Sequence, residues 1–141
     1  MVANAVVLGR VRQYGLLLLI GMAIAGIWNS SRRTFDVREV TVPEARALVD
    51  AGALVIDVRE RDKSAASHVP GALLIPLDLL ASNLPKIEAY KGKAIVVYCG
   101  NGSTLGPEAT QLLNKAGYAQ AVNLKEGIEG WRRAGLPVRS S

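Results

Sequence analysis

The feature that most constrains the fold is an apolar segment, residues 94–98, that ends directly at the single cysteine, Cys99. Its β-branched residues indicate a buried strand, and residues 108–115 have helical spacing of apolar side chains. The glycine-containing loop between them can direct backbone N–H groups at one point before the helix, which favours a thiolate there. We predict that Cys99 is a nucleophile. The alternative is a small buried apolar residue, the usual role of a lone cysteine.

Charge excludes one class of partner. The formal net charge is +5, but residues 1–33 contain four arginines and no acidic residue. Residues 34–141 therefore contain 13 basic and 12 acidic residues. Nucleic-acid binding needs basic side chains concentrated on the folded domain, so we predict no nucleic-acid partner. A single cysteine cannot form an intramolecular disulfide, and His and Cys are not clustered, so we predict neither a metal nor a cofactor.

Residues 11–28 are predicted to cross a lipid bilayer once. The apolar core from Tyr14 to Trp28 is uncharged and lies between pairs of arginines, with an aromatic residue at each end. A core helix of a soluble protein fits poorly, because the segment lacks a polar face. The alternative is a cleaved signal peptide, with a small-residue site at Ala23-Ile24-Ala25. We favour an uncleaved anchor, because the apolar run continues beyond that site.

Strands and helices alternate along the rest of the chain. The predicted strands are 37–40, 53–58, 72–75, 94–98 and 122–124. The predicted helices are one between a Thr41–Glu44 capping box and Gly52, then 61–67, 77–84, 108–115 and 127–134. This order predicts an α/β fold with a parallel sheet of about five strands and helices on both faces. Ligands of such sheets bind beyond the carboxyl ends of the strands, where Cys99 lies. We expect an anchor and linker at 1–33 and one domain at 34–141.

Two further polar positions have predicted roles. Asp57 and Arg59 flank the end of strand 53–58, and we predict an ion pair that supports the site rather than a direct role in proton transfer. His68 is the sole histidine. It precedes Val69-Pro70-Gly71, and we predict that it satisfies backbone groups rather than acting as a general base.

Four motifs, in the right order, resemble a single rhodanese (sulfurtransferase) domain, and the resemblance covers about residues 37–138. The motifs are Val55-Ile56-Asp57-Val58-Arg59-Glu60; His68-Val69-Pro70-Gly71-Ala72 with Ile75-Pro76-Leu77; Tyr98-Cys99; and Gly127-Ile128-Glu129-Gly130-Trp131 with Gly135-Leu136-Pro137-Val138. The resemblance implies that Cys99 accepts sulfur and that the loop amides hold the substrate. The loop residues are Gly100, Asn101, Gly102, Ser103 and Thr104.

The chain departs from the family pattern at several positions. Many thiosulfate-using members carry a basic residue where this chain has Thr104, and the loop looks like that of mercaptopyruvate sulfurtransferases. The donor class, thiosulfate or mercaptopyruvate, therefore stays open. Leu105 stands where phosphatase-like members of the fold continue toward an arginine, which disfavours phosphate-ester hydrolysis. Ser64 and Ser67 replace an aromatic residue and a glycine that are common in the family.

The expected function is transfer of a sulfane sulfur from a small donor, through a Cys99 persulfide, to a thiol or protein cysteine. Thr104 leaves an alternative open, a membrane-tethered binding or regulatory module with little turnover. An anchor followed by one such domain is similar to bacterial inner-membrane rhodanese-like proteins, and it implies a single-pass protein with a possible membrane-protein partner. We expect the domain on the cytoplasmic side, because a persulfide-forming cysteine needs a reducing compartment.

Overall fold

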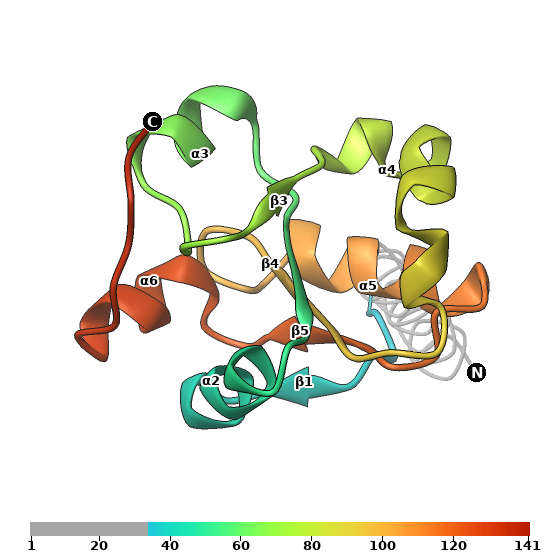
Figure 1. Cartoon of the computed structure of the whole chain (residues 1–141), viewed down its shortest axis with the longest axis horizontal. Helices are drawn as coiled ribbons and strands as arrows, with labels where there is room; N and C mark the ends of the chain where they lie inside the picture. Colours follow the sequence, from blue (N-terminus) through green and yellow to red (C-terminus); the bar gives the residue numbers. More distant parts are fainter. Residues whose placement is uncertain (1–33) are drawn as a thin grey trace, which may run out of the picture. The chain divides into compact units, whose positions relative to one another are not determined.

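The computed structural model describes residues 34–141, so the predicted anchor at 11–28 lies outside the described residues. In chain order the elements are β1 (Glu39–Val40), α2 (Val42–Asp50), β2 (Leu54–Asp57), α3 (Arg61–Ala66), β3 (Leu73–Leu74), α4 (Leu77–Asn83), η1 (Leu84–Tyr90), β4 (Ile95–Tyr98), α5 (Leu105–Lys115), β5 (Ala121–Leu124) and α6 (Gly127–Arg133) (Figure 1). Among these described helices, none has the length and apolar character needed to span a membrane.

The five strands form one parallel sheet in the order β1-β5-β4-β2-β3, which confirms the predicted class of fold. The central strand β4 pairs with β2 on one side, with Val97 opposite Ile56, and with β5 on the other. All residues of β4 are buried. Because Cys99 follows β4 directly, the sheet holds it at the carboxyl end of its central strand, as predicted.

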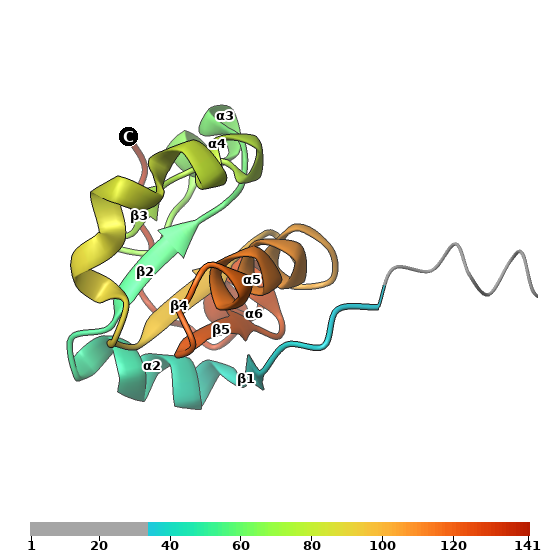
Figure 2. The ribbon, with the colours of Figure 1, turned by 90° about the vertical axis from the view of Figure 1, so that its right-hand side faces the viewer.

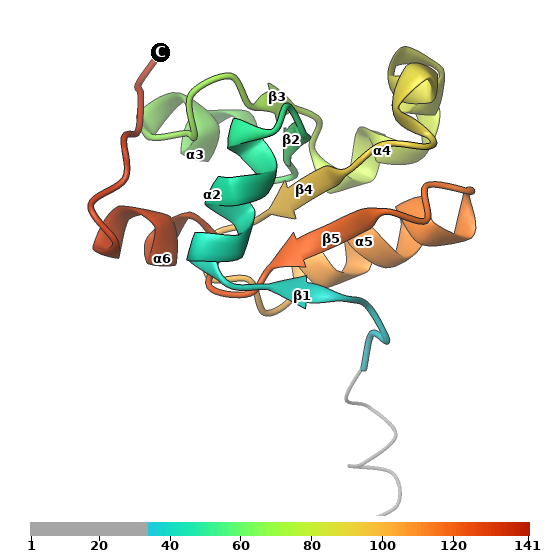
Figure 3. The same ribbon diagram turned by 60° about the horizontal axis from the view of Figure 1, so that its bottom comes forward.

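Helices cover both faces of the sheet, also as predicted. One core lies between β2 and β4 and the helical segments α4, η1 and α5. The other core lies between the sheet and the helices α2 and α6. In Figure 2, α2 lies across the sheet from α4 and η1, and Figure 3 shows α2 in front of the sheet and α5 behind it. Side chains alternate along a strand, so Val97 and Cys99 belong to the first core and Tyr98 to the second.

The local differences from prediction have physical reasons. Thr41 caps α2 as predicted, because its Oγ accepts a hydrogen bond from the N–H of Glu44. The reciprocal half of the predicted capping box differs, since the Glu44 carboxylate accepts from the Thr41 hydroxyl. Helix α5 begins at Leu105, three residues earlier than predicted, because a proline is compatible with a first helical turn and Pro107 lies in it. Residues 84–90 form a 3-10 helix directly after α4, whereas the predicted helix ended at residue 84. The edge strands β1 and β3 contain only two residues each.

Candidate functional site

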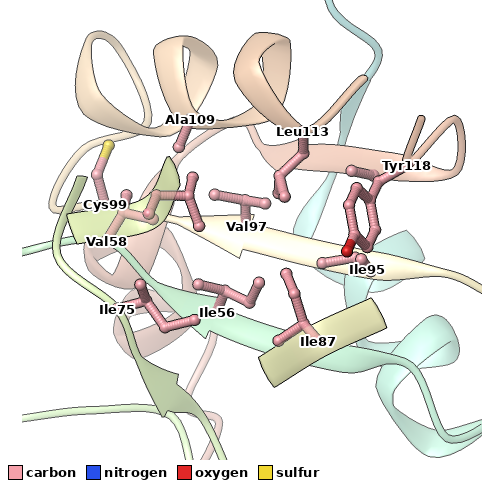
Figure 4. Close-up of a cluster of buried hydrophobic side chains, with 12 residues drawn as sticks. Ile56, Val58, Ile75, Ile87, Ile95, Val97, Cys99, Ala109, Leu113 and Tyr118 are labelled. Carbon is pink, nitrogen blue, oxygen red and sulfur yellow. The ribbon is translucent and has the colours of Figure 1, made fainter. Parts of the chain in front are cut away.

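Cys99 lies at the end of a row of buried side chains on β4. Figure 4 shows Ile95, Val97 and Cys99 in this row, facing Ala109 and Leu113 of α5. Only 2% of the cysteine is exposed. Its Sγ accepts a hydrogen bond from the backbone N–H of Gly102, with N and S 3.2 Å apart. The loop therefore directs a hydrogen-bond donor at the sulfur, an arrangement typical of a nucleophilic cysteine.

The loop after Cys99 returns over the sulfur because two glycines permit close backbone packing. Gly102 has φ +81°, and a Cβ there would collide with the carbonyl oxygen of Lys125. Gly127, at the start of α6, has φ +61°, and a Cβ there would collide with the carbonyl oxygen of Gly100. Both positions therefore require glycine. Residue 127 therefore lies in close contact with the loop.

Helix α6 binds the outer side of this loop. The N–H groups of Ile128 and Glu129 donate to the carbonyl oxygens of Cys99 and Gly100, both at 3.0 Å. These two carbonyl groups thus point to α6 rather than to the sulfur. An acceptor oxygen beside a thiolate would repel it, so their orientation leaves the donor at Gly102 unopposed.

The first turn of α5 packs directly against the sulfur. A Cβ built on Gly106 would lie 3.3 Å from the Cys99 Sγ and would collide with the Oδ1 of Asn123. The sulfur, this turn and the Asn123 side chain are therefore mutual neighbours. Because α5 begins at Leu105, its N-terminal end, where negative charge is favoured, lies beside Cys99.

The outer part of the loop is open to solvent. Asn101, Ser103 and Thr104 are exposed, and the Ser103 N–H and hydroxyl both donate to the Asn101 Oδ1, at 3.1 and 2.7 Å. Thr104 precedes α5 without capping it through its side chain. Of the predicted loop residues, Gly102 thus contacts the sulfur, and the polar side chains lie at the surface.

The predicted Asp57–Arg59 ion pair is present and buried. The Arg59 Nη2 and Nε donate to the two oxygens of Asp57 at 2.7 and 3.0 Å, and the Tyr98 hydroxyl donates to the Asp57 Oδ2 at 2.9 Å. Burial and the charge of Asp57 raise the pKa of Tyr98, so this hydroxyl stays protonated. Tyr98 points to the opposite face of the sheet from Cys99. The ion pair lies at the end of β2, and the Tyr98 hydroxyl links it to the end of β4 on the face of the sheet away from the sulfur.

His68 has the backbone role predicted for it. Its Nδ1 lies 2.9 Å from the carbonyl oxygen of Ser64, and because a carbonyl only accepts, Nδ1 carries the proton. Its backbone pairs in both directions with Arg139, near the end of the chain. Over residues 34–141, His, Cys, Asp and Glu side chains form no group of three that could hold a metal ion.

Sequence reasoning missed two residues of this site. Asn123 on β5 donates through Nδ2 to the carbonyl oxygen of Gly102 at 3.0 Å and to the Glu39 Oε2 at 2.9 Å. Its signal was a polar residue inside the apolar strand at 121–124. Glu39 had no comparable signal, because it is 84 positions away in sequence and meets Asn123 only through the pairing of β1 with β5.

Comparison with known proteins gives a consistent result. A family model described as rhodanese-like domain matches residues 41–134. Protein YibN of Escherichia coli is 36% identical over 107 residues, which are 74% of each chain. The human thiosulfate:glutathione sulfurtransferase is 35% identical over 108 residues, covering 65% of this chain and 90% of that protein.

Solved structures share the fold. A human single-domain sulfurtransferase superposes with a TM-score of 0.59 and 32% identity, over 68% of this chain and 96% of that one. A rhodanese-related protein from Thermoplasma volcanium superposes with a TM-score of 0.66 and 24% identity, over 74% and 99% of the two chains. The second likeness concerns the fold alone.

Proposed function

The chain belongs to the rhodanese-like domain family, and we propose that it is a sulfurtransferase whose Cys99 carries the transferred sulfur as a persulfide. Its sulfurtransferase relatives support a sulfur-transfer role in general. One observation carries the assignment to Cys99: the Gly102 N–H donates to its sulfur at the carboxyl end of β4, beside the first turn of α5. A backbone donor and a helix N-terminus beside the sulfur are surroundings in which nucleophilic cysteines are found.

The proposed reaction has two displacement steps. The Cys99 thiolate attacks the outer sulfur of thiosulfate, a new S–S bond forms, and sulfite leaves with the electron pair of the broken bond. With mercaptopyruvate, a C–S bond breaks instead and pyruvate leaves as its enolate, which takes up a proton. An acceptor thiolate then attacks the outer sulfur of the persulfide, and Cys99 leaves as a thiolate. Each step is balanced without an added oxidant or reductant.

Mass spectrometry of the intact protein tests this proposal. After incubation with thiosulfate or mercaptopyruvate, the wild type should gain one sulfur atom on the peptide that contains Cys99. Cys99→Ser should gain none and should transfer no sulfur, because no other cysteine can replace it. Sulfur transfer by Cys99→Ser at the wild-type rate would refute the assignment. If the wild type gains no sulfur from either donor, the alternative of a binding module with little turnover is favoured.

We also propose where this reaction takes place. Residues 11–28 would anchor the chain in a bacterial inner membrane, with the rhodanese-like domain in the cytoplasm. The support is the uncharged apolar sequence between flanking arginines and the need of a persulfide carrier for a reducing compartment. A membrane location would bring the domain close to membrane-protein acceptors.

A further inference from the structure

A side-chain amide ties the loop around Cys99 to the sheet. Asn123 is fully buried within β5, and its Nδ2 donates one hydrogen bond to the Gly102 carbonyl oxygen and one to the Glu39 carboxylate. The N–H of the same Gly102 donates to the Cys99 sulfur. Three hydrogen bonds therefore run in series from Glu39, through Asn123 and Gly102, to the sulfur.

The orientation of the Asn123 amide follows from its partners. A backbone carbonyl and a carboxylate can only accept, so the amide must present its NH₂ to both. The Oδ1 then faces the start of α5, where a Cβ on Gly106 would collide with it. Among residues 34–141 this buried oxygen has no hydrogen-bond partner. Leaving such an acceptor unpaired destabilises the fold, and an apolar residue would avoid that penalty.

The penalty of leaving the Asn123 Oδ1 unpaired is explained if the NH₂ group of the same side chain is needed to hold the loop. We propose that Asn123 is a positioning residue, held in turn by Glu39, that fixes the backbone conformation of Gly102 so that its N–H, in the preceding peptide, points at the Cys99 sulfur. Gly102 has φ +81° and, as a glycine, can reach many other backbone conformations. A hydrogen bond to its carbonyl oxygen anchors the peptide that follows Gly102, which restricts φ and ψ there and so limits the directions in which the Gly102 N–H can point. The effect on sulfur transfer rests on the proposed function of Cys99, whereas the effect on Gly102 does not.

Four substitutions in the full chain test this role. Asn123→Ala removes the donor to Gly102, and Glu39→Ala removes the outer support. Glu39→Gln is the conservative variant, because its amide oxygen can still accept from Asn123. Asn114→Ala is the matched control. Asn114 lies near the other end of α5, and its Nδ2 also donates to two backbone carbonyl oxygens, of Tyr118 at 2.9 Å and Ala121 at 3.2 Å.

The first readout is amide hydrogen exchange of Gly102, measured by NMR without any sulfur donor. Asn123→Ala should accelerate this exchange about tenfold, the order expected for loss of one hydrogen bond. Glu39→Ala should accelerate it less, and Glu39→Gln should restore the wild-type rate. Asn114→Ala should not change it. An unchanged Gly102 rate in Asn123→Ala, or an equal change in Asn114→Ala, would overturn the proposal.

The second readout is the rate of persulfide formation on Cys99, which should fall about tenfold in Asn123→Ala and stay at the wild-type level in Asn114→Ala. If the wild type forms no persulfide, the proposed function fails but the exchange measurement still decides the role of Asn123. If Asn123→Ala does not fold, Glu39→Ala decides it, since Glu39 is exposed. Wild-type Gly102 exchange in Glu39→Ala would then overturn the proposal.

Discussion

Thr104 ends the loop around Cys99 with an exposed neutral side chain, and residues 100–105 contain no Lys or Arg. Thiosulfate is a dianion that gains from a nearby cation. We therefore expect Thr104→Arg to raise kcat/KM for thiosulfate, by about tenfold for one charge-assisted contact. Thr104→Gln adds length without charge and is the control. Steady-state assays with thiosulfate and mercaptopyruvate would measure the change. Equal turnover of thiosulfate by wild type and Thr104→Arg would contradict the argument from loop charge.

At the scale of residues, prediction succeeded where the signal is local. The strand, cysteine and glycine loop at 94–104 are contiguous, and the Asp57–Arg59 pair spans two positions, so both could be inferred from sequence. Asn123 and Glu39 could not, because their hydrogen bonds depend on which strands are neighbours in the sheet. Local patterns do not determine that order.

At the scale of elements, β4 separates two functions on its two faces. Val97 and Cys99 face α5 and the loop, whereas Tyr98 faces the core beneath α2 and α6. The Tyr98 hydroxyl donates to Asp57 and accepts from the N–H of Val69 at 3.1 Å. It thereby joins β2, β4 and the segment that leads to β3. We infer that this face stabilises the strand end from which Cys99 emerges.

Tyr98→Phe tests this separation. The substitution leaves the Val69 N–H buried without its acceptor, so we expect the free energy of unfolding to fall by about 1–3 kcal/mol. Chemical denaturation would measure it. The Gly102 amide exchange should stay at the wild-type rate, because the hydroxyl lies on the other face of the sheet. A change at Gly102 as large as that in Asn123→Ala would contradict the separation of faces.

The same variant has a pH signature. The pKa of Tyr98 is raised by burial and by Asp57, so the folded protein keeps the proton at a pH where unfolded tyrosine, with a pKa of about 10, loses it. The unfolded state then binds fewer protons, and stability falls as the pH rises above about 10. We expect a smaller fall in Tyr98→Phe, which lacks this group.

Element boundaries were less predictable than element types. The α5 helix was predicted to start at Glu108 but starts at Leu105, because Gly106 and Pro107 lower helix propensity without preventing a first turn. This difference matters for the site. The three added residues form the turn that packs against the Cys99 sulfur.

At the scale of the whole chain, alternating strands and helices predicted the parallel sheet and the position of Cys99 at the carboxyl end of its strands. The domain boundary can be tested by truncation. Removal of residues 1–33 should release a folded domain with wild-type sulfur transfer, because both described cores are built from later residues. Removal of residues 1–40 should lower the rate of sulfur transfer, because β1 and Glu39 are lost. Equal activity of both truncated forms would contradict this expectation.

The topology needs a separate measurement on the intact protein. Protease added to the outside of spheroplasts should leave the rhodanese-like domain uncut if that domain is cytoplasmic. Digestion of the domain from outside, or a mature N-terminus at Gly26, would instead place it in the periplasm.

The two shortest strands also affect how copies of the domain behave together. Both edges of the sheet are formed by strands of only two residues, β1 and β3. A short edge presents few unpaired N–H and C=O groups to a strand of another molecule. Two copies of the domain therefore have little opportunity for strand-to-strand aggregation through the edges of their sheets.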